Sequence, residues 1–325
     1  IEMIREACKL ANASADFSKF DNNGDGYVDI VYAIYAGYGE ASNVSTLENT
    51  IWPHQWYLDT PLSLDGVQIS KYACNNELDG DSGSQIDGIG TFCHEFSHCL
   101  GLPDFYPTND TNGFGMNAWS IMDYGCYNDG GHTPCGYTGH ELDFLGWKEL
   151  VLLETPTDVS LQPMSEGGVA YKIVNDANPN EYYVVENHKR TRWDEHVPAE
   201  GMLVIHVDYL ESAWQNNSVN NTPSHQRMTI IPADNKRAAA SLAGDTYPGS
   251  SGNTSLTAVS TPAAECFVGD YMGKDITDIS IQDGIVTFSF MKGALLVPEQ
   301  QAVSDVTENG FTMNWEQVPG IKEYE

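Results

Sequence analysis

The segment HEFSHCLGLPD at residues 94–104 constrains the fold of this chain more than any other feature. It contains an HExxH motif, and on a helix of 3.6 residues per turn two histidines four positions apart stand on the same face. His94 and His98 can therefore share one metal ion, which requires a helix with one face turned toward a site. Glu95 is displaced from that face by about 100°. Its carboxylate can therefore act as a general base on metal-bound water without itself being a ligand.

A third ligand is expected from the chain reversal that follows the helix. Gly101 can adopt a left-handed conformation that ends the helix, and Pro103 prevents the helix from resuming. Asp104 then becomes the natural third ligand, while His132 and His140 in later segments stay open as alternatives. Two imidazoles and a carboxylate are typical of a catalytic zinc site, which keeps a fourth position for water. A chance HExxH on an ordinary helix would not account for glycine and aspartate at these offsets.

Residues 1–153 have the mixed pattern of an α/β (α+β) domain, and we expect this domain to be the catalytic one. Helical spacing runs through residues 1–18, and the continuous apolar run at 27–37 predicts a central strand. The pattern at 140–150 predicts another helix. The region between the motif and that helix is rich in glycine, asparagine and aromatic residues, which is typical of functional loops.

The pattern changes after the segment ETPTD at 154–158, which is expected to be a linker. Short alternating segments then predict an all-β sandwich domain over residues 154–293. Its strands are expected at 169–174, 181–188, 201–209, 227–234 and 284–290. Residues 294–325 resemble the opening of a fibronectin type III domain, with a turn at Asn309 and Gly310, cut off before completion. Because the chain begins inside a helical pattern and stops inside a strand pattern, we expect it to be a fragment.

A second candidate ion site lies in the loop DNNGDGYVD at residues 21–29. The candidate oxygen ligands for calcium are Asp21, Asn23, Asp25 and Asp29. The first three stand at alternate positions with Gly26 after them, as in loops that fold around calcium. The loop departs from an EF-hand because its twelfth position is Tyr32 and not glutamate, so Asp29 is the candidate substitute. The alternative is that these residues only form turns.

The charge of the chain excludes one class of partner. Its 15 basic and 46 acidic residues give a formal net charge of -31, and such a surface repels nucleic acid and anionic lipid headgroups. No apolar run reaches the roughly 20 residues that a membrane-spanning helix needs. We therefore expect neither nucleic-acid binding nor a transmembrane segment.

The motif HEFSHCLGLPD, with aspartate where related sites have a third histidine, resembles the immune inhibitor A family of secreted bacterial metallopeptidases. Other segments resemble that family's blocks in the same order: DNNGDGYVDIVYAIYAGYGE (21–40), IWPHQW (51–56), WSIMDYG (119–125), LGW (145–147), YYVVENHK (182–189) and GMLVIHVD (201–208). The resemblance covers residues 1 to about 290. It implies a metzincin-like (zincin-like) fold in which Met122, in the Met-turn position, lies beneath the metal. It also implies a bacterial protein that is secreted or held at the cell surface.

These observations predict a secreted zinc-dependent endopeptidase that hydrolyses peptide bonds of protein or peptide substrates, with Glu95 as general base. The alternative function is a catalytically inactive adhesion or binding protein that uses a metallopeptidase-like scaffold. The intact HExxHxxGxxD pattern argues against it, because a decayed scaffold would be expected to lose Glu95 first. The β-rich C-terminal modules are compatible with attachment to a cell surface in both cases.

Overall fold

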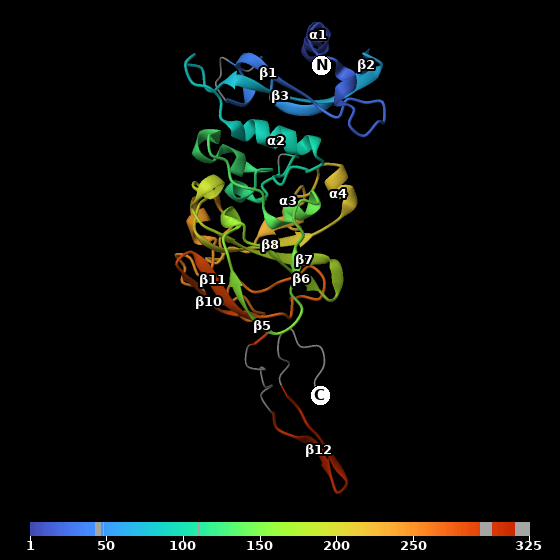
Figure 1. Cartoon of the computed structure of the whole chain (residues 1–325). Coiled ribbons are helices and arrows are strands. Elements are labelled where there is room, and N and C mark those ends of the chain that lie inside the picture. The colour runs from blue at the N-terminus through green and yellow to red at the C-terminus, as the bar shows by residue number, and fades with distance from the viewer. Residues whose placement is uncertain (43–46, 48, 110, 293–300, 316–325) are drawn as a thin grey trace.

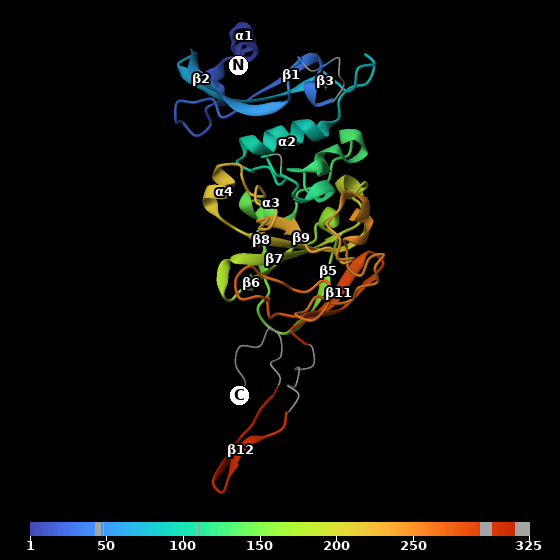
Figure 2. The ribbon, with the colours of Figure 1, turned by 180° about the vertical axis from the view of Figure 1, so that it is seen from behind.

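The computed structural model describes residues 1–42, 47, 49–109, 111–292 and 301–315. Helices and sheets alternate in layers along it, from α1 and the first sheet to the sheets of the β-rich region (Figures 1 and 2). The described residues form four α-helices: α1 (Glu2–Ala11), α2 (Ile89–Cys99), α3 (Gly139–Phe144) and α4 (Glu211–Gln215). The mixed α/β class expected from the sequence is thus confirmed. No helix among the described residues is long and apolar enough to cross a membrane.

The first sheet has the strand order β1-β3-β2. Its strands are β1 (Val31–Tyr38), β2 (His54–Leu64) and β3 (Val67–Leu78). β1 runs parallel to β3, and β2 is antiparallel to it. The run at 27–37 therefore does not form the central strand of the described sheet, and that expectation was wrong. The reason is burial: β1 has only half-buried and exposed positions, whereas β3 has five consecutive buried residues, 72–76, as a strand paired on both sides does.

Two helices cover the two faces of this sheet (Figures 1 and 2). α1 is shorter than the pattern at 1–18 predicted, and it buries Ile4 and Cys8 against Ile69 and Tyr72 of β3. α2, which carries the HExxH motif, lies on the opposite face. It approaches the loop after the motif so closely that a Cβ on Gly90 would lie 1.8 Å from the carbonyl oxygen of Cys126. Any larger residue would clash with this carbonyl group, so the glycine at position 90 is what allows α2 to pack against the loop.

The β-rich region consists of two further sheets. The larger one has the order β4-β6-β7-β8-β9, and the smaller one has the order β10-β11-β5. The strands are β4 (Val151–Leu152), β5 (Thr157–Leu161), β6 (Tyr171–Asn175), β7 (Asn178–His188), β8 (Gly201–Asp208), β9 (Met228–Ile230), β10 (Ile276–Gln282) and β11 (Ile285–Phe290). β8 is buried at every position. A strand buried on both faces requires a layer on each side of the larger sheet.

Two apolar clusters supply those layers. On one side, Val185 and Val204 of the larger sheet join Phe288 and Phe290 of the smaller sheet in one core. On the other side, strands β7, β8 and β9 pack against the loop region that follows α2. Leu203 and Ile205 share this second core with side chains of that region, namely Leu102, Phe105, Met116, Trp119 and Met122. β4 moreover precedes the predicted boundary at 153/154, yet it pairs with β6. The two parts of the chain are therefore packed together through a common core.

A buried ion cluster also links these parts. His188 lies between two carboxylates, with Nε2 2.8 Å from Glu186 and Nδ1 2.9 Å from Asp194. Glu186 also accepts a hydrogen bond from the backbone N–H of Gly139, the first residue of α3. Asp194 accepts one from the backbone N–H of Gly136, which precedes α3. Burial lowers the pKa of His188, but the charge and hydrogen bonds of Asp194 and Glu186 outweigh it and raise the pKa to about 10. The imidazole is therefore a buried cation at neutral pH.

The described C-terminal residues form a hairpin of β12 (Ser304–Thr307) and β13 (Gly310–Thr312). The hairpin turns through residues 308–309, one position earlier than the predicted turn. Residues 294–300 and 316–325 of the predicted fibronectin-like segment lie outside the described residues. The fibronectin assignment therefore stays a prediction.

Candidate metal centre

The helix α2 places the two histidines of the motif on one face. Their ring centroids are 4.7 Å apart, as one helical turn allows. α2 ends at Cys99, and Gly101 follows with a φ of 104°. This left-handed conformation reverses the chain, as expected, and returns Asp104 to the histidines.

Three potential ligand atoms converge at this point. His94 Nε2 and His98 Nε2 each lie 3.2 Å from Asp104 Oδ1, and the three groups all lie within 4.8 Å of one another. His94 Nδ1 is 2.8 Å from the carbonyl oxygen of Ile121, and His98 Nδ1 is 2.8 Å from that of Leu102. A carbonyl oxygen only accepts, so each Nδ1 carries the proton and each Nε2 directs a lone pair toward Asp104.

This arrangement fits a metal ion better than a hydrogen-bonded cluster. Asp104 Oδ1 is buried and has no hydrogen-bond partner among the described residues, and a buried orphan acceptor is costly. Two nitrogen lone pairs and one carboxylate oxygen therefore face a common point, which is the donor set that zinc takes in catalytic sites.

Glu95 lies beside this cluster and lines a cavity. The side chain is 6% exposed, and burial raises its pKa, as expected for a carboxylate moved out of water. The cavity has a volume of about 400 Å³, and Glu95 and His94 lie in its wall together with Trp52, Tyr106 and Tyr124. A carboxylate of raised pKa beside a metal site and open to a cavity is suited to accept a proton from water.

The loop around Met122 is joined to the cluster by backbone hydrogen bonds. Met122 is fully buried, and its carbonyl oxygen accepts a 2.9 Å hydrogen bond from the N–H of Phe105, the residue after Asp104. The neighbouring Ile121 carbonyl holds His94. The backbone on both sides of the predicted Met-turn is thus tied to residues of the cluster, while the role of the side chain stays a prediction.

Asn217, from the segment between α4 and β9, forms two hydrogen bonds with Asp104, the third candidate ligand. Its Nδ2 donates to Asp104 Oδ2 at 2.6 Å, and its Oδ1 accepts from the Asp104 backbone N–H at 2.6 Å. Asn220 and Asn221 hold the next residues of the same loop: Asn220 donates to the Phe105 carbonyl, and Asn221 accepts from the Thr108 N–H. The sequence analysis missed Asn217, and the asparagine-rich run QNNSVNN at 215–221 is the one signal that could have drawn attention to it.

Tyr106 was also missed, although it follows Asp104 by only two residues. Its ring lies nearly parallel to that of His94, with centroids 6.4 Å apart. Burial and then the Asp104 charge raise the pKa of Tyr106, so the phenol keeps its proton and can donate a hydrogen bond into the cavity.

His140, the first alternative third ligand, lies elsewhere. Its Nδ1 is 3.1 Å from the hydroxyl of Tyr182, and burial lowers its pKa to about 3. In the described part of the chain, the one group of three side chains that could hold a metal ion consists of His94, His98 and Asp104. His140 does not belong to it.

The predicted calcium loop is folded by its own side chains. The carboxylate of Asp21 accepts three backbone hydrogen bonds, from Gly24, Asp25 and Gly26. Asn23 Oδ1 accepts from the Asp25 N–H, and Asp29 Oδ2 accepts from the side chain of Asn22. Hydrogen bonds of this kind also suit a turn, so calcium binding stays a prediction.

Comparison with known proteins points to a family of peptidases. Residues 14–148 match the family model described as "Immune inhibitor A peptidase M6, catalytic domain". The chain is 28% identical to Immune inhibitor A of Bacillus thuringiensis subsp. alesti over 44% of this chain and 24% of that protein. It is 30% identical to Pre-pro-metalloprotease PrtV of Vibrio cholerae serotype O1 (strain M66-2) over 44% of this chain and 18% of that protein.

The matched part thus spans about a quarter or less of the length of these relatives. Both the helix with the HExxH motif and the loop through Met122 fall inside the matched residues, whereas Asn217 falls outside them. The resemblance inferred from the motifs is confirmed: residues 14–148 match the catalytic domain of the immune inhibitor A family of M6 peptidases.

Proposed function

We propose that this chain is a zinc-dependent endopeptidase. The observation that carries the proposal is the convergence of His94 Nε2, His98 Nε2 and Asp104 Oδ1, next to a cavity whose wall contains both His94 and Glu95. In this proposal His94, His98 and Asp104 hold the zinc ion. A zinc ion at this point would polarise a scissile carbonyl group and lower the pKa of water to about 7.

The protein groups would divide the remaining tasks. Glu95 accepts the proton of the attacking water and passes it to the leaving nitrogen, because its carboxylate is buried and reaches the cavity without being needed as a ligand. Tyr106 lies beside the cluster with a protonated phenol and can donate a hydrogen bond to the oxyanion that develops on the substrate carbonyl. The carbonyl oxygens of Ile121 and Leu102 keep both imidazoles in the tautomer that binds a metal.

The rest of the proposal concerns the surroundings of this centre. We take residues 1–153 as the catalytic domain with a metzincin-like fold, residues 154–293 as a β-sandwich packed against it, and residues 294–325 as a partial fibronectin type III-like module. We also propose secretion by a bacterium, with attachment to the cell surface through the C-terminal modules as an option, since the named relatives are bacterial. Asp21, Asn23, Asp25 and Asp29 remain the proposed calcium ligands.

The substitution Glu95→Ala tests the catalytic proposal. The variant should bind about one zinc per chain, because Glu95 is a base and not a ligand, yet it should no longer hydrolyse an unfolded protein substrate. Hydrolysis by the unsubstituted chain should also stop when a zinc chelator is added and return with zinc. Native activity of Glu95→Ala, or a loss of its zinc, would refute this role. An inactive unsubstituted chain with bound zinc would favour the non-catalytic binding protein instead.

A further inference from the structure

The cavity beside α2 continues into the β-rich region. A second hollow of about 550 Å³ shares the side chains of Tyr106 and Tyr124 with that cavity. A third hollow, of about 630 Å³, shares Pro223, Gln226 and Arg237 with the second. Because successive hollows are bounded by the same side chains, they adjoin one another. We call these three hollows together the furrow.

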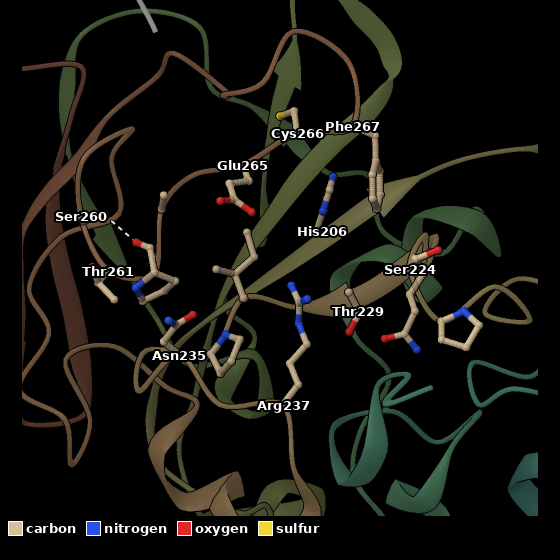
Figure 3. A pocket seen from close by; sticks show the side chains of 16 residues that line it. His206, Ser224, Thr229, Asn235, Arg237, Ser260, Thr261, Glu265, Cys266 and Phe267 are labelled. Atoms are coloured by element: carbon tan, nitrogen blue, oxygen red, sulfur yellow. Dashed lines mark hydrogen bonds between the residues drawn. The ribbon is translucent and has the colours of Figure 1, made fainter. Parts of the chain in front are cut away.

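The third hollow, shown in Figure 3, is the largest of the three, and the described residues of its wall hold no group of three converging metal-ligating side chains. Its wall carries hydroxyl and amide side chains, among them Ser224, Asn235 and Thr261. Such groups can form hydrogen bonds with the N–H and C=O groups of an extended peptide, which has a donor and an acceptor at nearly every residue. The furrow therefore joins the metal centre to a polar surface suited to a polypeptide backbone.

Arg237 is the only lysine or arginine among the described residues that line the furrow. Its Nε donates to the carbonyl oxygen of Ile230 at 3.1 Å, which fixes one edge of the guanidinium, and the other edge faces the hollow (Figure 3). Arginine ion pairs in the described chain involve Arg5 and Arg227, so Arg237 forms no direct ion pair there. Glu265 also lines the hollow, and its charge opposes the lowering of the Arg237 pKa by burial, but the two side chains are not in ion-pair contact. Arg237 is an exposed residue that lines the hollow, so a ligand in the hollow can reach its guanidinium.

We propose that the furrow binds an extended segment of the polypeptide substrate and that Arg237 binds a carboxylate of that segment, away from the cleaved bond. This inference rests on the proposed peptidase function. The formal net charge of -31 opposes the approach of an acidic segment, so its recognition requires a local cation that acts at short range. The planar guanidinium fork matches a carboxylate through two parallel hydrogen bonds. Arg237 would therefore favour substrates with an acidic residue at one fixed distance from the scissile bond.

Peptide binding to the Glu95→Ala variant tests this inference, because that variant leaves the peptides uncut. The probes are fluorescent peptides with amidated C-termini, in which one glutamate is moved along a sequence that otherwise carries glutamine. At one position, glutamate should tighten binding roughly tenfold relative to glutamine. Additional Arg237→Gln should abolish that difference. Additional Lys236→Gln should retain it, because Lys236 is exposed, pairs with Asp234 at 3.8 Å and does not line the furrow.

The outcomes separate this inference from the peptidase proposal. Equal affinity for all the peptides, whether they carry glutamate, glutamine, an amidated or a free C-terminus, or a carboxylate preference that survives Arg237→Gln, overturns the carboxylate site. Tighter binding of a peptide with a free C-terminus than of its amidated form, removed by Arg237→Gln, supports the site and assigns it to the chain end of the substrate. Failure of the unsubstituted chain to hydrolyse any protein refutes the peptidase proposal, whereas the binding difference is measured without hydrolysis.

Discussion

Asn217→Asp tests how far the β-rich region determines the metal centre. Asn217 has a φ of 50°, a left-handed conformation that costs alanine about 1 kcal/mol or more but that aspartate tolerates. The substitution keeps the acceptor for the Asp104 N–H and replaces only the amide that donates to Asp104 Oδ2. A second carboxylate then faces the proposed ligand at the distance of a former hydrogen bond.

The expected magnitude follows from that one contact. A hydrogen bond to a charged group contributes about 1.5–3 kcal/mol, and about 1.4 kcal/mol corresponds to a tenfold change in affinity. Groups that orient a metal ligand typically change affinity by about 10- to 100-fold when they are lost. We therefore expect the zinc dissociation constant of Asn217→Asp to rise by about 10- to 100-fold.

Competition with a chromophoric zinc chelator measures this constant. Asn221→Asp is the matched control, because it makes the same charge change in the same segment but faces Thr108 and not Asp104. Its zinc affinity should stay within about twofold of the unsubstituted chain. If Asn217→Asp binds zinc as tightly as Asn221→Asp, Asn217 does not orient the ligand, and the reasoning fails.

Three further predictions concern other groups. Asp104→Ala should lower zinc affinity by orders of magnitude and activity with it, and Asp104→His should restore part of both; unchanged zinc content would place the third ligand elsewhere. Calcium should raise the melting temperature, and Asp25→Ala should remove that rise; a melting curve unaffected by millimolar calcium would contradict the calcium site. His188→Gln should destabilise the fold by about 3–5 kcal/mol, since it leaves two buried carboxylates without their cation. Because the pKa of His188 is raised to about 10, its contribution is complete below its ordinary pKa and is lost as pH rises through about 10. Denaturant unfolding at neutral and alkaline pH measures the free energy of unfolding that is lost as pH rises. If His188→Gln loses as much stability at alkaline pH as the unsubstituted chain, His188 is not the cause of that loss.

The local elements with strong periodicity could be predicted from the sequence. The helix of the motif and the strands β6, β7, β8, β9 and β11 lie where the pattern indicated. β10 was not predicted, because its burial pattern is interrupted and the pairing with β11 contains a register shift. The predicted helix at 140–150 ends at Phe144, since Gly146 with a φ of 68° reverses the chain. Such boundaries depend on single backbone conformations rather than on a repeated pattern.

The convergence of His94, His98 and Asp104 could also be predicted, because short spacings and local backbone rules determine it. The partners that hold it could not. Asn217 contacts Asp104 across 113 positions in the sequence, and no spacing rule relates residues so far apart. The shared core between Met122 and strand β8 was hidden for the same reason, since an amphipathic pattern indicates that a face is buried but not what covers it.

The separation of 113 residues between Asp104 and Asn217 has a consequence for biosynthesis. At about 5–20 residues per second, a ribosome needs roughly 6–23 s to extend the chain from one to the other. During that interval the motif is complete, but the side chain that holds Asp104 and the strand β9 beyond it have not yet been made. A nascent chain therefore acquires its finished candidate metal centre only after the β-rich region has been translated at least as far as Asn217. In the proposed peptidase, peptide-bond hydrolysis would then begin only after Asn217 has been made, when the segments that precede it can already be folded and protected from cleavage.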